Sequence, residues 1–220
     1  MGVSLVQTIA VYALPVILAI TLHEAAHGYV AKHFGDLTAY QEGRVSLNPL
    51  RHIDPFGTIA LPLATLAIGG IMFGWAKPVP VNFRSLRRPK RDMLWVAAAG
   101  PGANFAMALC WALVMKLASL TPGALWSDFL LAVGKAGIQV NVIFLVLNLL
   151  PVPPLDGGRI VTSLLPHRLA YHYSRIEPYG IFILLGAIIA EGLLRVPLLG
   201  AILYPPYRFV VGLIHSLAGL

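Results

Sequence analysis

The chain has 220 residues, of which 58% are apolar and only 11% are charged, and its mean hydropathy is +0.78. Soluble domains carry about 45–50% apolar and about 25% charged residues, so this composition predicts a polytopic all-α membrane protein and excludes disordered, collagen-like and disulfide-scaffold classes. The formal net charge of +7 does not indicate nucleic-acid binding, because the cations cluster in loops between apolar segments.

About five to six hydrophobic segments follow one another along the chain. They are expected near residues 3–33, 55–75, 93–120, 129–150, 179–190 and 198–217. The second segment contains Pro62 and Gly69-Gly70, so it either spans the bilayer or re-enters it. After it, the alternating pattern of Lys77 to Phe83 predicts a small extended or β element near residues 76–83. We expect one integral-membrane domain over 1–220, with core motifs in 22–159 and C-terminal helices in 178–220.

The distribution of cations predicts the orientation of the segments. Six Lys and Arg residues lie between Lys77 and Arg91, whereas 121–128 contains none. The positive-inside rule therefore places the loop before segment 93–120 in the cytoplasm and the turn after it outside. An external N-terminus with a re-entrant 55–75 fits this pattern. A cytoplasmic N-terminus with 55–75 as a true span is the alternative.

The first segment carries the residues His23-Glu24-Ala25-Ala26-His27. On a helix, His23 and His27 lie on one face, where both imidazoles can reach one metal ion with Glu24 beside them. An ionisable residue inside a spanning helix costs roughly 2.5–3.5 kcal/mol on insertion scales and usually marks function. Three such residues within about one turn therefore predict a metal site.

A catalytic zinc site usually takes three protein ligands and leaves a fourth position open, so a third buried ligand is needed. The strongest candidate is Asp156, in the stretch Asn148-Leu-Leu-Pro-Val-Pro-Pro-Leu-Asp156-Gly-Gly-Arg159. Its prolines cannot continue the preceding helix, and irregular backbone at membrane depth is tolerated where it lines a protein cavity. We predict one Zn²⁺ per chain, held by His23, His27 and Asp156.

The H-E-x-x-H and N-x-x-P-x-x-P-L-D-G motifs together resemble those of the site-2 proteases, which are intramembrane zinc metalloproteases. Gly100-Pro-Gly-Ala-Asn104 and the stretch 73–82 also resemble motifs of the compact prokaryotic branch, which has no PDZ or nucleotide-binding module. The resemblance implies His23, His27 and Asp156 as zinc ligands and Glu24 as the catalytic acid and base. It further suggests that Asn148 binds substrate, although this amide could equally cap the end of its helix. Asn104 is a second candidate for a substrate contact, although an interhelical hydrogen bond is the favoured alternative for it.

The resemblance implies the partner and the location as well. The expected substrate is a single-spanning membrane protein already trimmed by another protease, cleaved in or near its transmembrane segment during regulated intramembrane proteolysis. The extended stretch Lys77–Asn82 is expected to pair with it by β-addition. We expect an integral protein of a prokaryotic cell membrane, in contact with the lipid bilayer and not with nucleic acid, with its active site nearer the cytoplasmic side.

One rival function explains the buried ligands as well. A divalent-metal transporter or channel would also place His and Asp ligands inside the membrane. It does not explain Glu24 within the H-E-x-x-H spacing, and a permeation path would need further ligands along its length.

Overall fold

The computed structural model describes residues 4–60, 76–194 and 197–220, and in these ranges the protein is helical with no β-strand. The long helices are α1 (Leu5–His33), α4 (Pro89–Ser119), α5 (Ser127–Asn148), α8 (Glu177–Leu194) and α9 (Leu198–Ala218). Shorter elements are α2 (Thr38–Gln41), η1 (Pro49–Arg51), η2 (Pro55–Ala60), η3 (Phe83–Ser85), α6 (Asp156–Leu164) and α7 (His167–Ser174). This confirms the all-α class.

Four of the described helices, α1, α4, α5 and α9, are long and apolar enough to cross a membrane. Helices α7 and α8 form a bent pair that makes a fifth candidate span. The predicted segments at 3–33, 93–120, 129–150, 179–190 and 198–217 therefore correspond to helices, with boundaries shifted by a few residues. Segment 55–75 lies outside the described residues apart from the π-helical turn η2.

Helix boundaries follow from local sequence signals. Ser4 caps α1 through a reciprocal capping box with Gln7, and Pro89 starts α4, where a missing N–H costs nothing. Helix α5 ends at Asn148 because Pro151 lies just beyond it.

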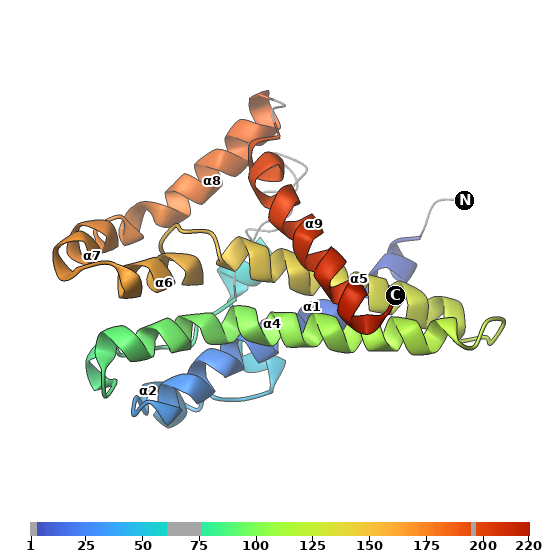
Figure 1. The fold of residues 1–220 in the computed structure, drawn as a ribbon, viewed down its shortest axis with the longest axis horizontal. Coiled ribbons are helices and arrows are strands. Elements are labelled where there is room, and N and C mark those ends of the chain that lie inside the picture. Colours follow the sequence, from blue (N-terminus) through green and yellow to red (C-terminus); the bar gives the residue numbers. More distant parts are fainter. Residues whose placement is uncertain (1–3, 61–75, 195–196) are drawn as a thin grey trace.

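Helices α1, α4 and α5 form the centre of the fold, and α4 packs against both of the others and against α6 (Figure 1). Apolar residues of α4, α5 and α9 form the larger buried cluster, which includes Ala108, Val142 and Ile214. Gly137 lets α5 approach α4 closely, because a Cβ there would lie 2.2 Å from the Trp111 ring. Small residues therefore set the spacing of the central helices.

The direction of α1 follows from its contacts with α4. Ala19 and His23 face Asn104, whereas His27 faces Val96, so α1 runs antiparallel to α4 and Ser4 lies at the end where α4 turns into α5 (Figure 1). At the opposite end the Arg87 N–H donates to the Phe34 carbonyl at 3.0 Å. The connection between α1 and α4 therefore begins and ends at the same end of the molecule.

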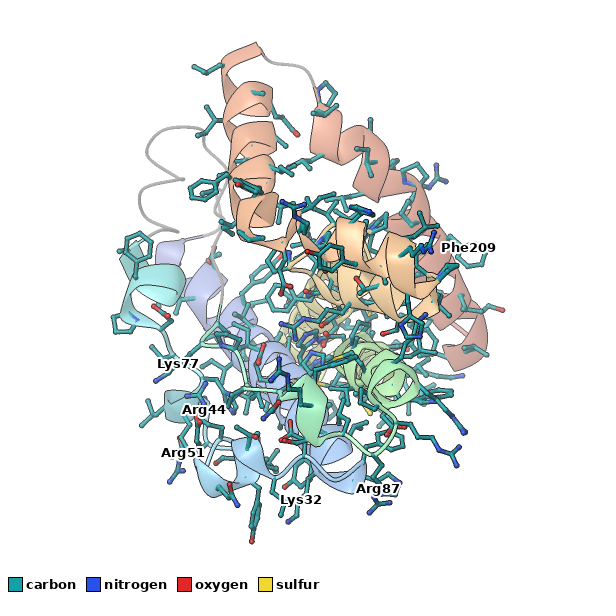
Figure 2. The ribbon with its side chains drawn as sticks, turned by 90° about the vertical axis from the view of Figure 1, so that its left-hand side faces the viewer. Lys32, Arg44, Arg51, Lys77, Arg87 and Phe209 are labelled. Carbon is teal, nitrogen blue, oxygen red and sulfur yellow. The ribbon has the colours of Figure 1, made fainter. Side chains whose placement is uncertain are left out.

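That end is the basic one. Figure 2 looks onto it and shows Lys32, Arg44, Arg51, Lys77 and Arg87 gathered there, whereas Phe209 of α9 lies apart from them. His27 lies six residues from the end of α1, which is about 9 Å along a helix. The predicted metal site is therefore close to the basic end.

The segment predicted to be a small β element has a different structure. Residues 76–82 are in neither helix nor strand, and 83–85 form the 3₁₀ turn η3. Pro78 and Pro80 have no N–H, which leaves Val79 as the one backbone donor among these three residues, and Glu24 accepts its hydrogen bond. The small β element is therefore absent from the described residues 76–83, whereas the pairing of this segment with a substrate stays a prediction.

Candidate metal centre

Helix α1 presents the two histidines of its H-E-x-x-H motif on one face. His23 and His27 are about one helical turn apart, so their rings lie on the same side of the helix. Both are buried, and their Nε2 atoms lie 3.1 Å apart. This face packs against α4 and not against the surroundings of the bundle.

The third residue of the cluster, Asp156, follows the irregular stretch 149–155 that separates α5 from α6. Asp156 is the first residue of α6, and its Oδ2 lies 3.2 Å from His23 Nε2 and 3.4 Å from His27 Nε2. Gly157 makes this approach possible, because a Cβ there would lie 2.3 Å from the carbonyl oxygens of Leu149 and Leu150. The Pro/Gly stretch therefore folds α6 back onto the end of α5.

The separations of these three donor atoms match a zinc site. Ligands about 2.0 Å from one tetrahedral Zn²⁺ lie about 3.3 Å from one another. The observed separations are 3.1, 3.2 and 3.4 Å. Among the described residues, these three form the one cluster of His, Cys, Asp and Glu side chains that could hold a metal ion.

The position of the proton on each imidazole ring also favours a bound cation. His23 Nδ1 lies 2.6 Å from Asn104 Oδ1 and His27 Nδ1 lies 2.7 Å from the Val96 carbonyl oxygen, so each neutral ring uses its proton at Nδ1. Both Nε2 lone pairs then point toward Asp156 Oδ2, a buried oxygen with no hydrogen-bond donor. Three converging lone pairs are stabilised by a metal ion between them.

The environment of Asp156 keeps it ionised. Burial alone would raise the pKa of its carboxyl group. In the metal-free site, protonation of His27 and His23 would place positive charge beside Asp156, which outweighs the effect of burial and lowers the pKa of its carboxyl group. A metal ligand must be deprotonated, so the carboxylate is in the required form.

Gly100 on α4 keeps the space in front of the donor atoms open. A Cβ at this position would lie 2.5 Å from His27 Nε2 and 2.6 Å from His23 Nε2. Only glycine leaves that space free. The sequence showed Gly100 as part of a small-residue motif, but the two imidazoles opposite it become visible only in the folded chain.

Glu24 lies on the same helix and is oriented by the segment 77–82. Its Oε2 accepts a hydrogen bond of 2.8 Å from the Val79 N–H. Arg44 donates to the Lys77 carbonyl at 2.8 Å, and Asp36 accepts from the Asn82 N–H at 2.6 Å, so the segment is anchored on both sides of Val79. Sequence reasoning missed this contact, because 55 residues separate its partners.

The two asparagines predicted to bind substrate have different surroundings. Asn148 is partly exposed, and its Nδ2 donates to the Phe144 carbonyl one turn earlier in α5. Asn104 is fully buried, and its amide contacts His23 and Asn141. Asn104 therefore offers a substrate no surface in this structure and instead orients the His23 ring.

A helical membrane protein whose H-E-x-x-H helix meets a buried aspartate has the architecture of a membrane-embedded zinc hydrolase. The profile described as "Peptidase family M50" matches residues 114–189. The chain is 39% identical over 172 residues to "Putative zinc metalloprotease YwhC" of Bacillus subtilis, which covers 77% of this chain and 75% of that protein. No solved structure matches the chain.

Two mycobacterial relatives, both named "Putative zinc metalloprotease Rip2", are more distant. The Mycolicibacterium smegmatis protein is 36% identical over 64% of this chain, and the Mycobacterium tuberculosis protein is 34% identical over 69% of it. The chain spans about half of their length, at 52% and 54%. The chain therefore belongs to peptidase family M50, the site-2 protease family, and is a zinc metalloprotease.

Proposed function

We propose that this protein hydrolyses a peptide bond in or near the transmembrane segment of a membrane-protein substrate, as a step of regulated intramembrane proteolysis. The observation that carries the proposal is the position of the site. His23, Glu24 and His27 lie within a helix of membrane-spanning length and composition, and Asp156 is buried against them.

His23, His27 and Asp156 would hold the zinc ion, and their three donor atoms leave a fourth position open. When bound, zinc supplies Lewis-acid activation of water and of the scissile carbonyl. Glu24 takes the proton of the attacking water and later passes it to the leaving amine. The Val79 N–H fixes one oxygen of Glu24, which leaves the other oxygen to carry the proton.

A cavity of about 590 Å³ lies beside the site and is the best candidate for the substrate channel. Its lining includes Val81, Met93, Pro153, Gly158, Arg159 and Thr162. His23, Glu24, His27 and Asp156 do not line this cavity, but two of its lining residues lie close to the centre along the chain: Gly158 is two residues from Asp156, and Val81 is two residues from Val79. A substrate helix must unwind before its carbonyl reaches the ligands, and this mostly apolar cavity can hold the unwound chain. The partly exposed Asn148 remains our candidate for a substrate contact.

The partner that fits this site is a single-spanning membrane protein whose outer part another protease has already removed. A small extramembrane remainder would allow its helix to approach the bundle laterally within the bilayer. The proposed site receives one unwound segment of this substrate. We propose no nucleic-acid partner.

The full chain reconstituted in lipid vesicles with a single-spanning model substrate tests this function. Mass spectrometry of the products should place the cleaved bond within or next to the apolar segment, and a zinc chelator should abolish cleavage. Cleavage restricted to extramembrane loops would contradict the proposed substrate class. Zinc flux into the vesicles without any cleavage would contradict the protease function itself.

We further propose that the protein lies in a prokaryotic cell membrane with its basic end in the cytoplasm. In the antiparallel packing of α1 and α4, Ser4 lies at the end opposite this basic surface, which supports an external N-terminus. The proposed metal centre then lies nearer the cytoplasmic side.

Cysteine labelling in intact cells tests this orientation. In a Cys110→Ala background, which removes the exposed native thiol, Ser4→Cys should react with an impermeant reagent from outside. Ser85→Cys, in η3 at the basic end, should react only after the membrane is permeabilised. Labelling of both positions from the cytoplasmic side only would refute the external N-terminus, and labelling of both from outside would refute the cytoplasmic position of the basic end.

A further inference from the structure

A chain of buried amides connects the proposed zinc ligand His23 to α5. Asn104 Oδ1 lies 2.6 Å from His23 Nδ1, and Asn104 Nδ2 donates to Asn141 Oδ1 at 3.0 Å. Asn141 Nδ2 in turn donates to the Gly137 carbonyl at 2.9 Å. Both asparagines are fully buried, so solvent does not compete for these bonds.

Two backbone carbonyls fix the direction of the bonds in this chain, that of Gly137 at its far end and that of Ala19 beside Asn104. A carbonyl oxygen only accepts, so the Gly137 carbonyl requires the NH₂ group of Asn141 and leaves its Oδ1 to face Asn104. Asn141 Oδ1 then requires the NH₂ group of Asn104, which the Ala19 carbonyl also accepts at 3.3 Å. Asn104 therefore presents its oxygen, and not its NH₂ group, to His23.

The orientation of Asn104 decides the tautomer of His23. With the Asn104 oxygen facing Nδ1, the neutral ring carries its proton there, and the Nε2 lone pair is free toward His27 and Asp156. If the amide were reversed, its NH₂ group would favour the tautomer protonated at Nε2. That proton would occupy the side of the ring that faces the metal centre.

We propose that Asn141 is a positioning residue for zinc binding, which acts through Asn104 to hold His23 in its metal-binding tautomer. The proposal rests on the proposed ligand role of His23. His27 needs no such device, because its Nδ1 faces the Val96 backbone carbonyl directly. Asn141 is thus the outermost member of a relay that serves only one of the two histidines.

Zinc affinity of the detergent-solubilised full chain, measured by chelator competition, tests the relay. Asn104→Leu removes the acceptor of His23 and should weaken zinc binding by about 10–100-fold, as loss of an outer-shell partner typically does. Asn141→Leu should weaken it about 10-fold or less. The double variant should bind zinc no more weakly than Asn104→Leu alone, because Asn141 acts through Asn104.

A purely structural role for Asn141, as an interhelical hydrogen bond between α4 and α5, predicts a different result. Gln139→Leu is the matched control, because it removes the α1–α5 hydrogen bond that the Tyr12 hydroxyl donates to Gln139 Oε1 at 3.1 Å and leaves the Asn141–Asn104–His23 contacts in place. It should leave zinc affinity unchanged. Equal weakening by Gln139→Leu and Asn141→Leu, or additive effects in the Asn104/Asn141 double variant, would overturn the proposal.

Two further measurements keep the proposal falsifiable if Asn141→Leu folds poorly. Asn104→Asp presents an oxygen to His23 in either orientation. Adding Asn141→Ser to Asn104→Asp should therefore leave zinc affinity unchanged, whereas Asn141→Ser alone should lower it.

Nitrogen-15 NMR of the metal-free protein should show His23 protonated at Nδ1 in the natural chain and a tautomer mixture in Asn141→Ser. An unchanged tautomer would contradict the relay. Undiminished zinc binding by His23→Ala would instead contradict the proposed ligand set.

Discussion

Gly100→Ala should abolish tight zinc binding and reduce proteolysis below detection, although it adds only one methyl group. That methyl would lie within 2.6 Å of the Nε2 atoms of both His23 and His27, in the space where these donors converge. Loss of an outer-shell partner costs about 10–100-fold in metal affinity, so blocking two donor atoms should cost more than about 100-fold. Chelator competition on the purified chain measures this effect.

Gly102→Ala is the matched control for this substitution. Gly102 lies two residues further along α4 and is exposed, and a Cβ there meets no atom within 4 Å. It should bind zinc normally, with stability unchanged or raised by up to about 1 kcal/mol through helix propensity. Normal zinc affinity in Gly100→Ala would show that the metal lies elsewhere, and equal loss in both variants would point to a general effect on α4.

Glu24→Gln should lower the rate of peptide hydrolysis by about 10²–10⁴-fold while zinc remains bound. Glutamine has the same size and can still accept the Val79 N–H through its oxygen, but it cannot take up a proton. Turnover of the model substrate and zinc content should be measured on the same preparation. Glu42→Gln, at an exposed position outside the site, should leave both values unchanged.

Two results would contradict the assigned role of Glu24. Near-normal hydrolysis by Glu24→Gln would show that another group carries the proton. Loss of zinc together with activity would show that Glu24 supports the metal centre and would leave its catalytic role without support.

The clustering of His23, His27 and Asp156 was predictable from the sequence, because the histidine spacing is a local pattern and polar groups inside apolar segments carry a free-energy cost. The spacing of His23 and His27 requires a shared helix face, and charged or polar ligands inside apolar segments are retained mainly for function. Asp156 was recognised from the prolines and glycines around it. Helices α6 and α7 were not predicted, because they are short and too polar to stand out in a search for spanning segments.

The supporting contacts were not predictable, because they join residues that are far apart in the chain. The role of Gly100 depends on two rings carried by α1, and the hydrogen bond from Val79 to Glu24 depends on the anchored path of 77–82. The sequence predicts Asn104 as a candidate substrate contact, because it shows that an amide is present but does not show that the amide is buried. Alternation in Lys77–Asn82 suggested a strand, but the Lys77 N–H donates to the His52 carbonyl and the Val79 N–H donates to Glu24, and the sequence does not show these contacts.

X-ray absorption at the zinc edge, on the purified full chain and on Asp156→Ala, tests the central claim most directly. The structure predicts one zinc ion per chain, bound by two imidazole nitrogens and one carboxylate oxygen, with no sulfur ligand. In Asp156→Ala the carboxylate contribution should disappear and zinc affinity should fall by more than about 100-fold. An unchanged spectrum with undiminished affinity in Asp156→Ala would contradict the assignment of His23, His27 and Asp156 as the zinc site.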